Sequence, residues 1–163
     1  MKNLNQLLQI LLKAEIDFIL IGGYAGVVHG SNQLTRDLDI CAALTVQDIQ
    51  KLQDCLKDYH PKHRMNPNFK PSFLEEALPS NIENLNAVYL ETDLGILDII
   101  KSVIAVGDFE TVKQGAVQVE VFGLSCQVIS LDHLIQAKEK MGRDKDKSTL
   151  HELYAIKKKL SES

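Results

Sequence analysis

Hydrophobic residues near the start of the chain change from helical spacing to short unbroken runs. Leucines at positions 4, 7, 8, 11 and 12 recur every three or four residues, which predicts a helix over about 2–14. The run 18–21 is continuously apolar and stops at two glycines, as a buried strand would, and a second helix is expected over 24–29. A further apolar run, 38–44, predicts another buried strand.

The rest of the chain is expected to contain two strand pairs and further helices. Thr45 and Asp48 have the spacing of a capping box, which predicts the start of a helix. Turn residues separate the apolar runs of each strand pair, and Ser130 is suited to cap a helix. The predicted strand pairs are 87–90 with 96–100 and 117–122 with 125–129, and the predicted later helices are 130–140 and 145–160.

This order of elements predicts the fold class. It favours an α/β (α+β) arrangement in which a mixed, mainly antiparallel sheet is flanked by helices. The four prolines fall between Pro61 and Pro79 among asparagines and serines, which predicts an irregular flap at about 60–81. We therefore expect a single domain over 1–163, with carboxyl-terminal helices at about 130–160.

Composition excludes several classes of protein. A chain of 163 residues that is 45% hydrophobic and 25% charged can bury a continuous core, unlike a disordered chain. No apolar run approaches the roughly 18 residues that a membrane span needs, so we expect a cytoplasmic protein without a membrane partner. The three cysteines include no C-x-x-C pair, which argues against a disulfide framework or a zinc knuckle.

Charge is distributed unevenly. Between Lys138 and Lys159 eight basic residues stand against four acidic ones, although the whole chain carries 18 Lys and Arg against 22 Asp and Glu. An acidic body with a basic carboxyl-terminal segment suits a site that handles a polyanion through bound cations. A solvated helix face would produce the same pattern, so both interpretations stay open.

The segment between Gly22 and Asp39 carries the most chemical information. Gly22 and Gly23 follow a predicted strand and would let the backbone approach an anion closely, although such a turn can also need glycine for steric reasons. Asp37 and Asp39 are two positions apart on a predicted strand, so their carboxylates point to the same side. Neighbouring carboxylates repel unless a cation lies between them, and Mg²⁺ prefers such oxygen ligands.

A third carboxylate, Asp98, interrupts the apolar run 96–100. A buried charge without a partner is costly, so Asp98 requires either a bound cation or an edge position open to water. A bridge to Lys101 is disfavoured because the two side chains are separated by an odd number of strand positions. Asp98 is therefore a candidate third ligand of the same metal site.

Together these residues resemble the signature of the nucleotidyltransferase superfamily, the DNA polymerase beta-like group, in which two small residues after a strand precede an Asp-x-Asp pair. Over roughly residues 16–153 the chain resembles the abortive-infection AbiEii toxin-like bacterial nucleotidyltransferases. The family usually has arginine where Gln33 stands, which leaves one phosphate or acceptor contact open. The matching segments are Gly22–Ala25, His29–Gly30, Thr35–Asp39, Thr92–Asp98, Leu134–Lys138 and Gly142–Asp146.

The resemblance implies a two-metal enzyme that moves a nucleoside monophosphate from an NTP to a hydroxyl acceptor. Mg²⁺ or Mn²⁺ would be bound by Asp37, Asp39 and Asp98, which would also be the catalytic residues. The acceptor could be RNA, a protein or a small molecule, and a homodimer or partner chain could complete the site. The implied nucleotide-binding residues are Gly22, Gly23, Thr35, Arg36, Lys138, Arg143 and Lys145.

Other interpretations of the same residues remain. The chain could be a catalytically inactive nucleotidyltransferase-like binding module or a component of a toxin–antitoxin pair. A dinucleotide-binding domain is less favoured, because Gly22-Gly23 lacks the G-x-G spacing. Asp146 could pair with Lys138 or Arg143 instead of leaving those cations for a ligand.

Overall fold

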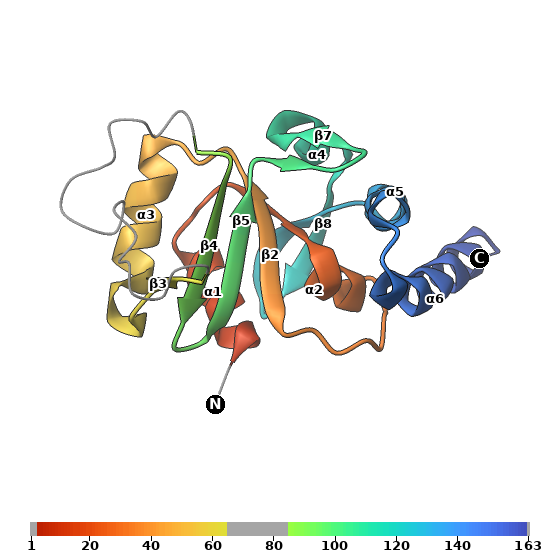
Figure 1. Cartoon of the computed structure of the whole chain (residues 1–163), viewed down its shortest axis with the longest axis horizontal. Helices are drawn as coiled ribbons and strands as arrows, with labels where there is room; N and C mark the ends of the chain where they lie inside the picture. The colour runs from red at the N-terminus through yellow and green to blue at the C-terminus, as the bar shows by residue number, and fades with distance from the viewer. Residues whose placement is uncertain (1–2, 65–84, 163) are drawn as a thin grey trace.

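A computed structural model describes residues 3–64 and 85–162, and within them seven strands form one mixed sheet (Figure 1). Their order across the sheet is β3-β4-β5-β2-β1-β9-β8. A separate two-stranded sheet consists of β6 (Ser102–Val103) and β7 (Gly107–Asp108). The strands of the large sheet are β1 (Phe18–Ile21), β2 (Asp37–Ala42), β3 (Lys62–His63), β4 (Ala87–Thr92), β5 (Gly95–Ile100), β8 (Val117–Val121) and β9 (Leu124–Val128).

Helices flank the large sheet, with α3 at one end of the view in Figure 1 and α5 and α6 at the other. The side chain of Thr45 accepts a hydrogen bond from the backbone of Asp48, and Asp48 accepts one in return, so the predicted capping box starts α3. Ser130 caps α5 as predicted. The helices are α1 (Leu4–Lys13), α2 (Gly22–Val28), α3 (Val46–Leu56), α4 (Phe109–Gly115), α5 (Leu131–Met141) and α6 (Asp144–Ser161), with a 3-10 turn at Lys57–Tyr59.

The strand pairings confirm the predicted mixed, mainly antiparallel sheet. β1–β2, β3–β4, β4–β5 and β8–β9 are antiparallel, whereas β1–β9 and β2–β5 are parallel. The parallel pairing of β2 with β5 places Asp39 directly beside Asp98. The antiparallel pairing of β1 with β2 also argues against the dinucleotide-binding alternative, whose first two strands run parallel around a crossover helix.

Alternation along β2 separates the core from the polar face of the sheet. Leu38 and Ile40 are completely buried, whereas Asp37 and Asp39 alternate with them and are only partly buried. The same core contains Leu7 and the other apolar residues on the inner face of α1. Burial of the apolar set thus directs both carboxylates to the opposite face.

Several short elements were not predicted from the sequence. β6, β7 and α4 have too few residues to show a hydrophobic period. Lys62 and His63 fall at the start of the mostly irregular flap predicted at about 60–81, and there they form the short strand β3 by pairing with Glu91 and Leu90. The flap residues 65–81 lie outside the described part of the chain.

No helix in the described part of the chain has both the length and the apolar character that crossing a lipid bilayer demands.

Candidate functional site

Every site residue predicted from the sequence lines one cleft of about 890 Å³. The cleft lies where the end of β1, the polar face of β2 and β5, and the connection between α5 and α6 come together. Residues far apart in sequence therefore share one space. The predicted residues that line it are Gly22, Gly23, Thr35, Arg36, Asp37, Asp39, Asp98, Lys138, Arg143 and Lys145.

The three carboxylates influence one another electrostatically across β2 and β5. Burial and the neighbouring Asp98 and Asp37 raise the pKa of Asp39 from 3.8 to about 6, against the opposing effect of Lys138 and Arg64. Asp37 also acts to raise the pKa of Asp98. The sequence-based prediction that these acids face a common space is consistent with this arrangement.

The raised pKa of Asp39 makes the stability of the fold depend on pH. Well below pH 3.8 Asp39 is protonated in both the folded and the unfolded chain. Above about pH 6 it is ionised in both, and the folded chain carries a penalty of up to about 3 kcal/mol. In denaturant titrations with EDTA, the wild type should lose stability relative to Asp39→Asn as the pH rises from about 4 to 7. A stability difference between the two proteins that stays constant from about pH 4 to pH 7 would contradict the raised pKa of Asp39.

Gly22 allows the turn between β1 and α2 to approach Asp39. Its φ of +68° lies in the left-handed region, and a Cβ at this position would overlap the Asp39 carboxylate. A Cβ on Gly23 would lie 3.0 Å from the Oγ1 atom of Thr35. Because α2 has only seven residues, the value of this turn lies in its close backbone approach more than in a helix dipole.

Arg64 is a cleft residue that the sequence analysis missed. Its Nη2 donates to Asp98 Oδ2 at 2.9 Å and its Nε donates to Oδ1 at 3.3 Å. The guanidinium carbon lies 5.3 Å from the centre of the Tyr89 ring. Burial raises the pKa of Asp98, with Arg64 opposing the effect. The partner that Asp98 requires is therefore supplied at least in part by the protein itself.

Nothing in the local sequence pointed to Arg64, because its position depends on the pairing of β3 with β4. The Arg64 backbone N–H donates to the Tyr89 carbonyl at 2.9 Å, which continues the pairing beyond His63. A contact of this kind is determined by tertiary structure and leaves no periodic signal.

The donor set suits a divalent cation, although it is not closed around one. Across residues 3–64 and 85–162 there is no group of three or more His, Cys, Asp or Glu side chains arranged to hold a metal ion. Arg64 contacts both oxygens of Asp98. The chemistry still fits, because Asp37, Asp39 and Asp98 offer hard oxygen ligands, and a cation would offset the burial and the neighbouring carboxylates that together raise the pKa of Asp39.

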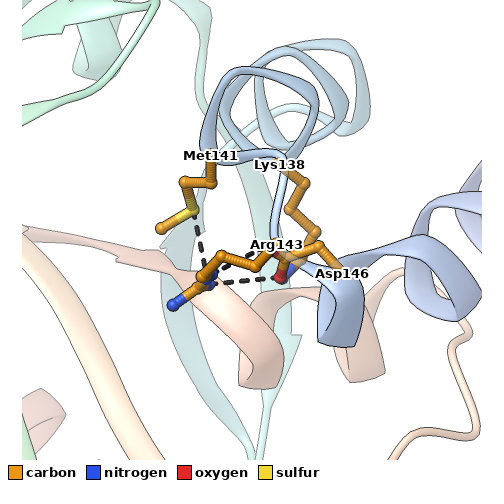
Figure 2. A network of polar contacts seen from close by, with 4 residues as sticks. All are labelled: Lys138, Met141, Arg143 and Asp146. Atoms are coloured by element: carbon orange, nitrogen blue, oxygen red, sulfur yellow. Dashed lines mark hydrogen bonds and ion pairs between the residues drawn. The ribbon is translucent and has the colours of Figure 1, made fainter.

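A second polar cluster joins the end of α5 to the start of α6 (Figure 2). Asp146 accepts from Arg143 Nε at 2.7 Å and from Arg143 Nη2 at 3.1 Å, and Lys138 Nζ lies 3.5 Å from its Oδ1 atom. Arg143 also donates to the Met141 sulfur at 3.4 Å. Both ion pairs proposed from the sequence as alternatives are therefore present together.

The remaining predicted residues, Thr35, Arg36 and Lys145, also line the cleft. Thr35 donates from its hydroxyl to the Asp37 carbonyl at 3.0 Å, which holds the chain just before β2. Arg36 and Lys145 are exposed. Because both side chains are exposed and line the cleft, they can reach an anionic ligand there.

Gln33, at the position where the related family usually has arginine, contacts α6. Its side-chain amide donates to Glu152 Oε2 at 3.2 Å, and Glu152 also accepts from the Asn32 backbone at 2.5 Å and the Ser31 hydroxyl at 3.1 Å. Glu152 therefore ties the loop before β2 to α6. Gln33 lines the cleft but contributes no positive charge to it.

Comparisons of the sequence find no match to any protein-family model, and no curated protein is similar enough in sequence to count as a match. Comparisons of the structure do find similar folds. One is a Thermotoga maritima protein described as a "putative nucleotidyltransferase", with a TM-score of 0.56 and 15% identity over 92% of this chain and 91% of that one. Another is an antigenic nucleotidyltransferase-like protein from Paracoccidioides brasiliensis, with a TM-score of 0.51 and 14% identity over 93% of this chain and 72% of that one.

These similarities concern the arrangement of the backbone. They do not confirm the resemblance to AbiEii toxin-like enzymes, which stays a prediction. At 14–15% identity they do not transfer an activity or a substrate. The chain has the nucleotidyltransferase-like fold.

Proposed function

We propose that the protein is a metal-dependent nucleotidyltransferase that transfers a nucleoside monophosphate from an NTP to a hydroxyl group. One observation carries the proposal: Asp37, Asp39 and Asp98 line the same cleft from two neighbouring strands. The nucleotidyltransferase-like fold supports it. The raised pKa of Asp39 supports it too, since burial and the neighbouring carboxylates disfavour the ionised form and a bound cation would favour it.

Asp37, Asp39 and Asp98 would hold Mg²⁺ or Mn²⁺. When bound, the ions would stabilise negative charge on the phosphate oxygens and lower the pKa of the acceptor hydroxyl. Gly22 would let the backbone approach the ligand where a side chain would collide with Asp39.

The basic residues of the cleft would bind the triphosphate. Lys138 and Arg143 lie on the α5–α6 side of the cleft. Lys138 acts to lower the pKa of Asp39, and Asp39 acts to raise the pKa of Arg143. Arg36 and Lys145, which line the cleft and are exposed, would add further contacts. In the reaction the acceptor oxygen forms a bond to the α-phosphorus. The bond from that phosphorus to the oxygen between the α- and β-phosphates breaks, so pyrophosphate leaves, and the hydroxyl proton passes to water.

A catalytically inactive binding module is the second candidate, because Arg64 already neutralises part of the charge on Asp98. Under this alternative the cleft would bind a nucleotide or a partner without transferring a group. For an active enzyme the proposed acceptor is RNA, a protein or a small molecule, and the enzyme could have a toxin-like or another role. A homodimer or a partner chain could complete the acceptor side of the site.

An active nucleotidyltransferase and an inactive binding module are distinguished by following a labelled phosphate of the NTP. The protein is incubated with Mg²⁺, fractionated RNA, protein and small molecules from a bacterial extract, and each NTP labelled at either the α- or the γ-phosphate. We expect α-label, but not γ-label, to enter one fraction, and Asp37→Asn to prevent it. Transfer of γ-label would indicate phosphoryl transfer instead, and nucleotide binding without transfer of either label would favour the binding module.

A further inference from the structure

Asp146 is a buried carboxylate placed between two cations of the cleft. It is 2% exposed, and Lys138 beside it is 8% exposed. Burial alone would raise the pKa of Asp146, but Arg143 and Lys138 outweigh this and lower it below 3.8. The carboxylate is therefore ionised at neutral pH and holds both cations against it.

The backbone around Asp146 gives this cluster a defined position. Gly142 ends α5 in the left-handed conformation with φ of 61°, and Arg143 is the residue that precedes the first turn of α6. Asp146 thus receives Lys138 from the last turns of one helix and Arg143 from the start of the next (Figure 2). The bidentate contact with Arg143 restrains the guanidinium plane as well as its charge.

Both cations also interact electrostatically with Asp39 on β2. Lys138 acts to lower the pKa of Asp39, and Asp39 contributes to raising the pKa of Arg143. All three members of the cluster line the cleft. The cluster therefore lies on the wall of the proposed nucleotide site.

We propose that Asp146 is a positioning residue, which holds Lys138 and Arg143 in the arrangement that binds the triphosphate of the nucleotide. The inference rests on the proposed function and adds a residue to it. Asp146 would not itself contact the anionic ligand, because its oxygens are already used by the two cations. Its contribution would be to orient these cations before the ligand binds.

A positioning role and an effect of net charge predict opposite changes in nucleotide affinity when Asp146 is replaced by asparagine, so the two can be distinguished. Asp146→Asn removes a negative charge from the wall of a site for a polyanion, so charge alone predicts tighter binding. Positioning predicts weaker binding, because Lys138 and Arg143 lose the group that orients them. Asp146→Glu retains the charge but moves the carboxylate. A positioning role again predicts weaker binding, whereas an effect of charge alone predicts no change in affinity.

Asp144→Asn is a matched control for the change in charge. Asp144 lies two positions before Asp146 on α6, its side chain is 96% exposed, and it pairs with Lys147 at 3.1 Å. Replacing it changes the net charge equally without touching Lys138 or Arg143. Its effect on nucleotide binding should therefore reveal the contribution of charge.

The experiment is calorimetric titration of each protein with ATP, GTP, CTP, UTP and inorganic tripolyphosphate in the presence of Mg²⁺, with a thermal melt of each variant. We expect Asp146→Asn and Asp146→Glu to weaken binding by about tenfold or more, and Asp144→Asn to change it by less than about twofold. In the labelling assay KM should rise more than kcat falls. If the Asn variant does not fold, the Glu variant decides the result.

The outcomes separate this inference from the function on which it rests. If the folded Asp146 variants bind the nucleotide as tightly as the wild type or more tightly, the positioning role is overturned and the proposed function stays intact. A wild type that binds neither a nucleotide nor tripolyphosphate would contradict both.

Discussion

Asp39→Asn is expected to abolish metal-dependent nucleotide binding while leaving the fold as stable as the wild type or more stable. The substitution removes a carboxylate that burial and its neighbours disfavour in the ionised form, so at pH 7 it should stabilise the folded chain by up to about 3 kcal/mol. It also removes a proposed ligand of the cation, and Mg²⁺-dependent affinity for NTP should fall by about 100-fold or more. Calorimetry and denaturant titration measure the two effects on the same samples.

The opposite directions of these effects distinguish a binding role from a structural one. Asp54→Asn serves as the control, since Asp54 is exposed on α3 and does not line the cleft. It should change neither the affinity nor the stability by a comparable amount. An Asp39→Asn protein that binds Mg²⁺ and NTP as tightly as the wild type would exclude Asp39 as a ligand.

Gly22→Ala is expected to damage both the fold and the site. Its φ of +68° strains an alanine, and the new methyl group would overlap the Asp39 carboxylate. The combined cost should be about 2–4 kcal/mol of unfolding free energy, and displacement of Asp39 should also weaken Mg²⁺-dependent nucleotide binding. Thermal melts and calorimetry at a temperature where the variant remains folded measure the two losses.

Gly23→Ala is the matched control for the neighbouring position. Its backbone is not in the left-handed region, and the added Cβ would approach the Thr35 hydroxyl at 3.0 Å, so a small adjustment of that side chain could relieve the contact. Its cost should be about 1 kcal/mol. Equal losses in the two variants would show that neither the left-handed φ of Gly22 nor the contact with Asp39 is the cause.

Local patterns were sufficient to predict most helices and strands and part of the candidate site. Two-residue periodicity placed Asp37 and Asp39 on one face of β2, and the structure confirms that Leu38 and Ile40 face the core between and beyond them. The pairing of Asp146 with Lys138 or Arg143 was predicted as two alternatives, and the structure contains both contacts. Signals of this kind depend only on neighbouring residues.

Contacts between distant segments could not be predicted in this way. The β4–β5 hairpin and the strand β2 were each predicted, but the pairing of β2 with β5 was not, so the parallel register that brings Asp98 next to Asp39 became known only from the structure. The same is true of Arg64, which a two-residue strand brings to Asp98 across 34 positions of sequence. Gln33 and Glu152 are separated by 119 positions, and neither residue type indicates the other.

The presence of a nucleotide site built on the three carboxylates is tested most directly by titrating the wild-type protein with a non-hydrolysable NTP, with and without Mg²⁺. We expect saturable binding that requires the metal and disappears in Asp39→Asn. Binding that is indifferent to Mg²⁺ and to this substitution would contradict it.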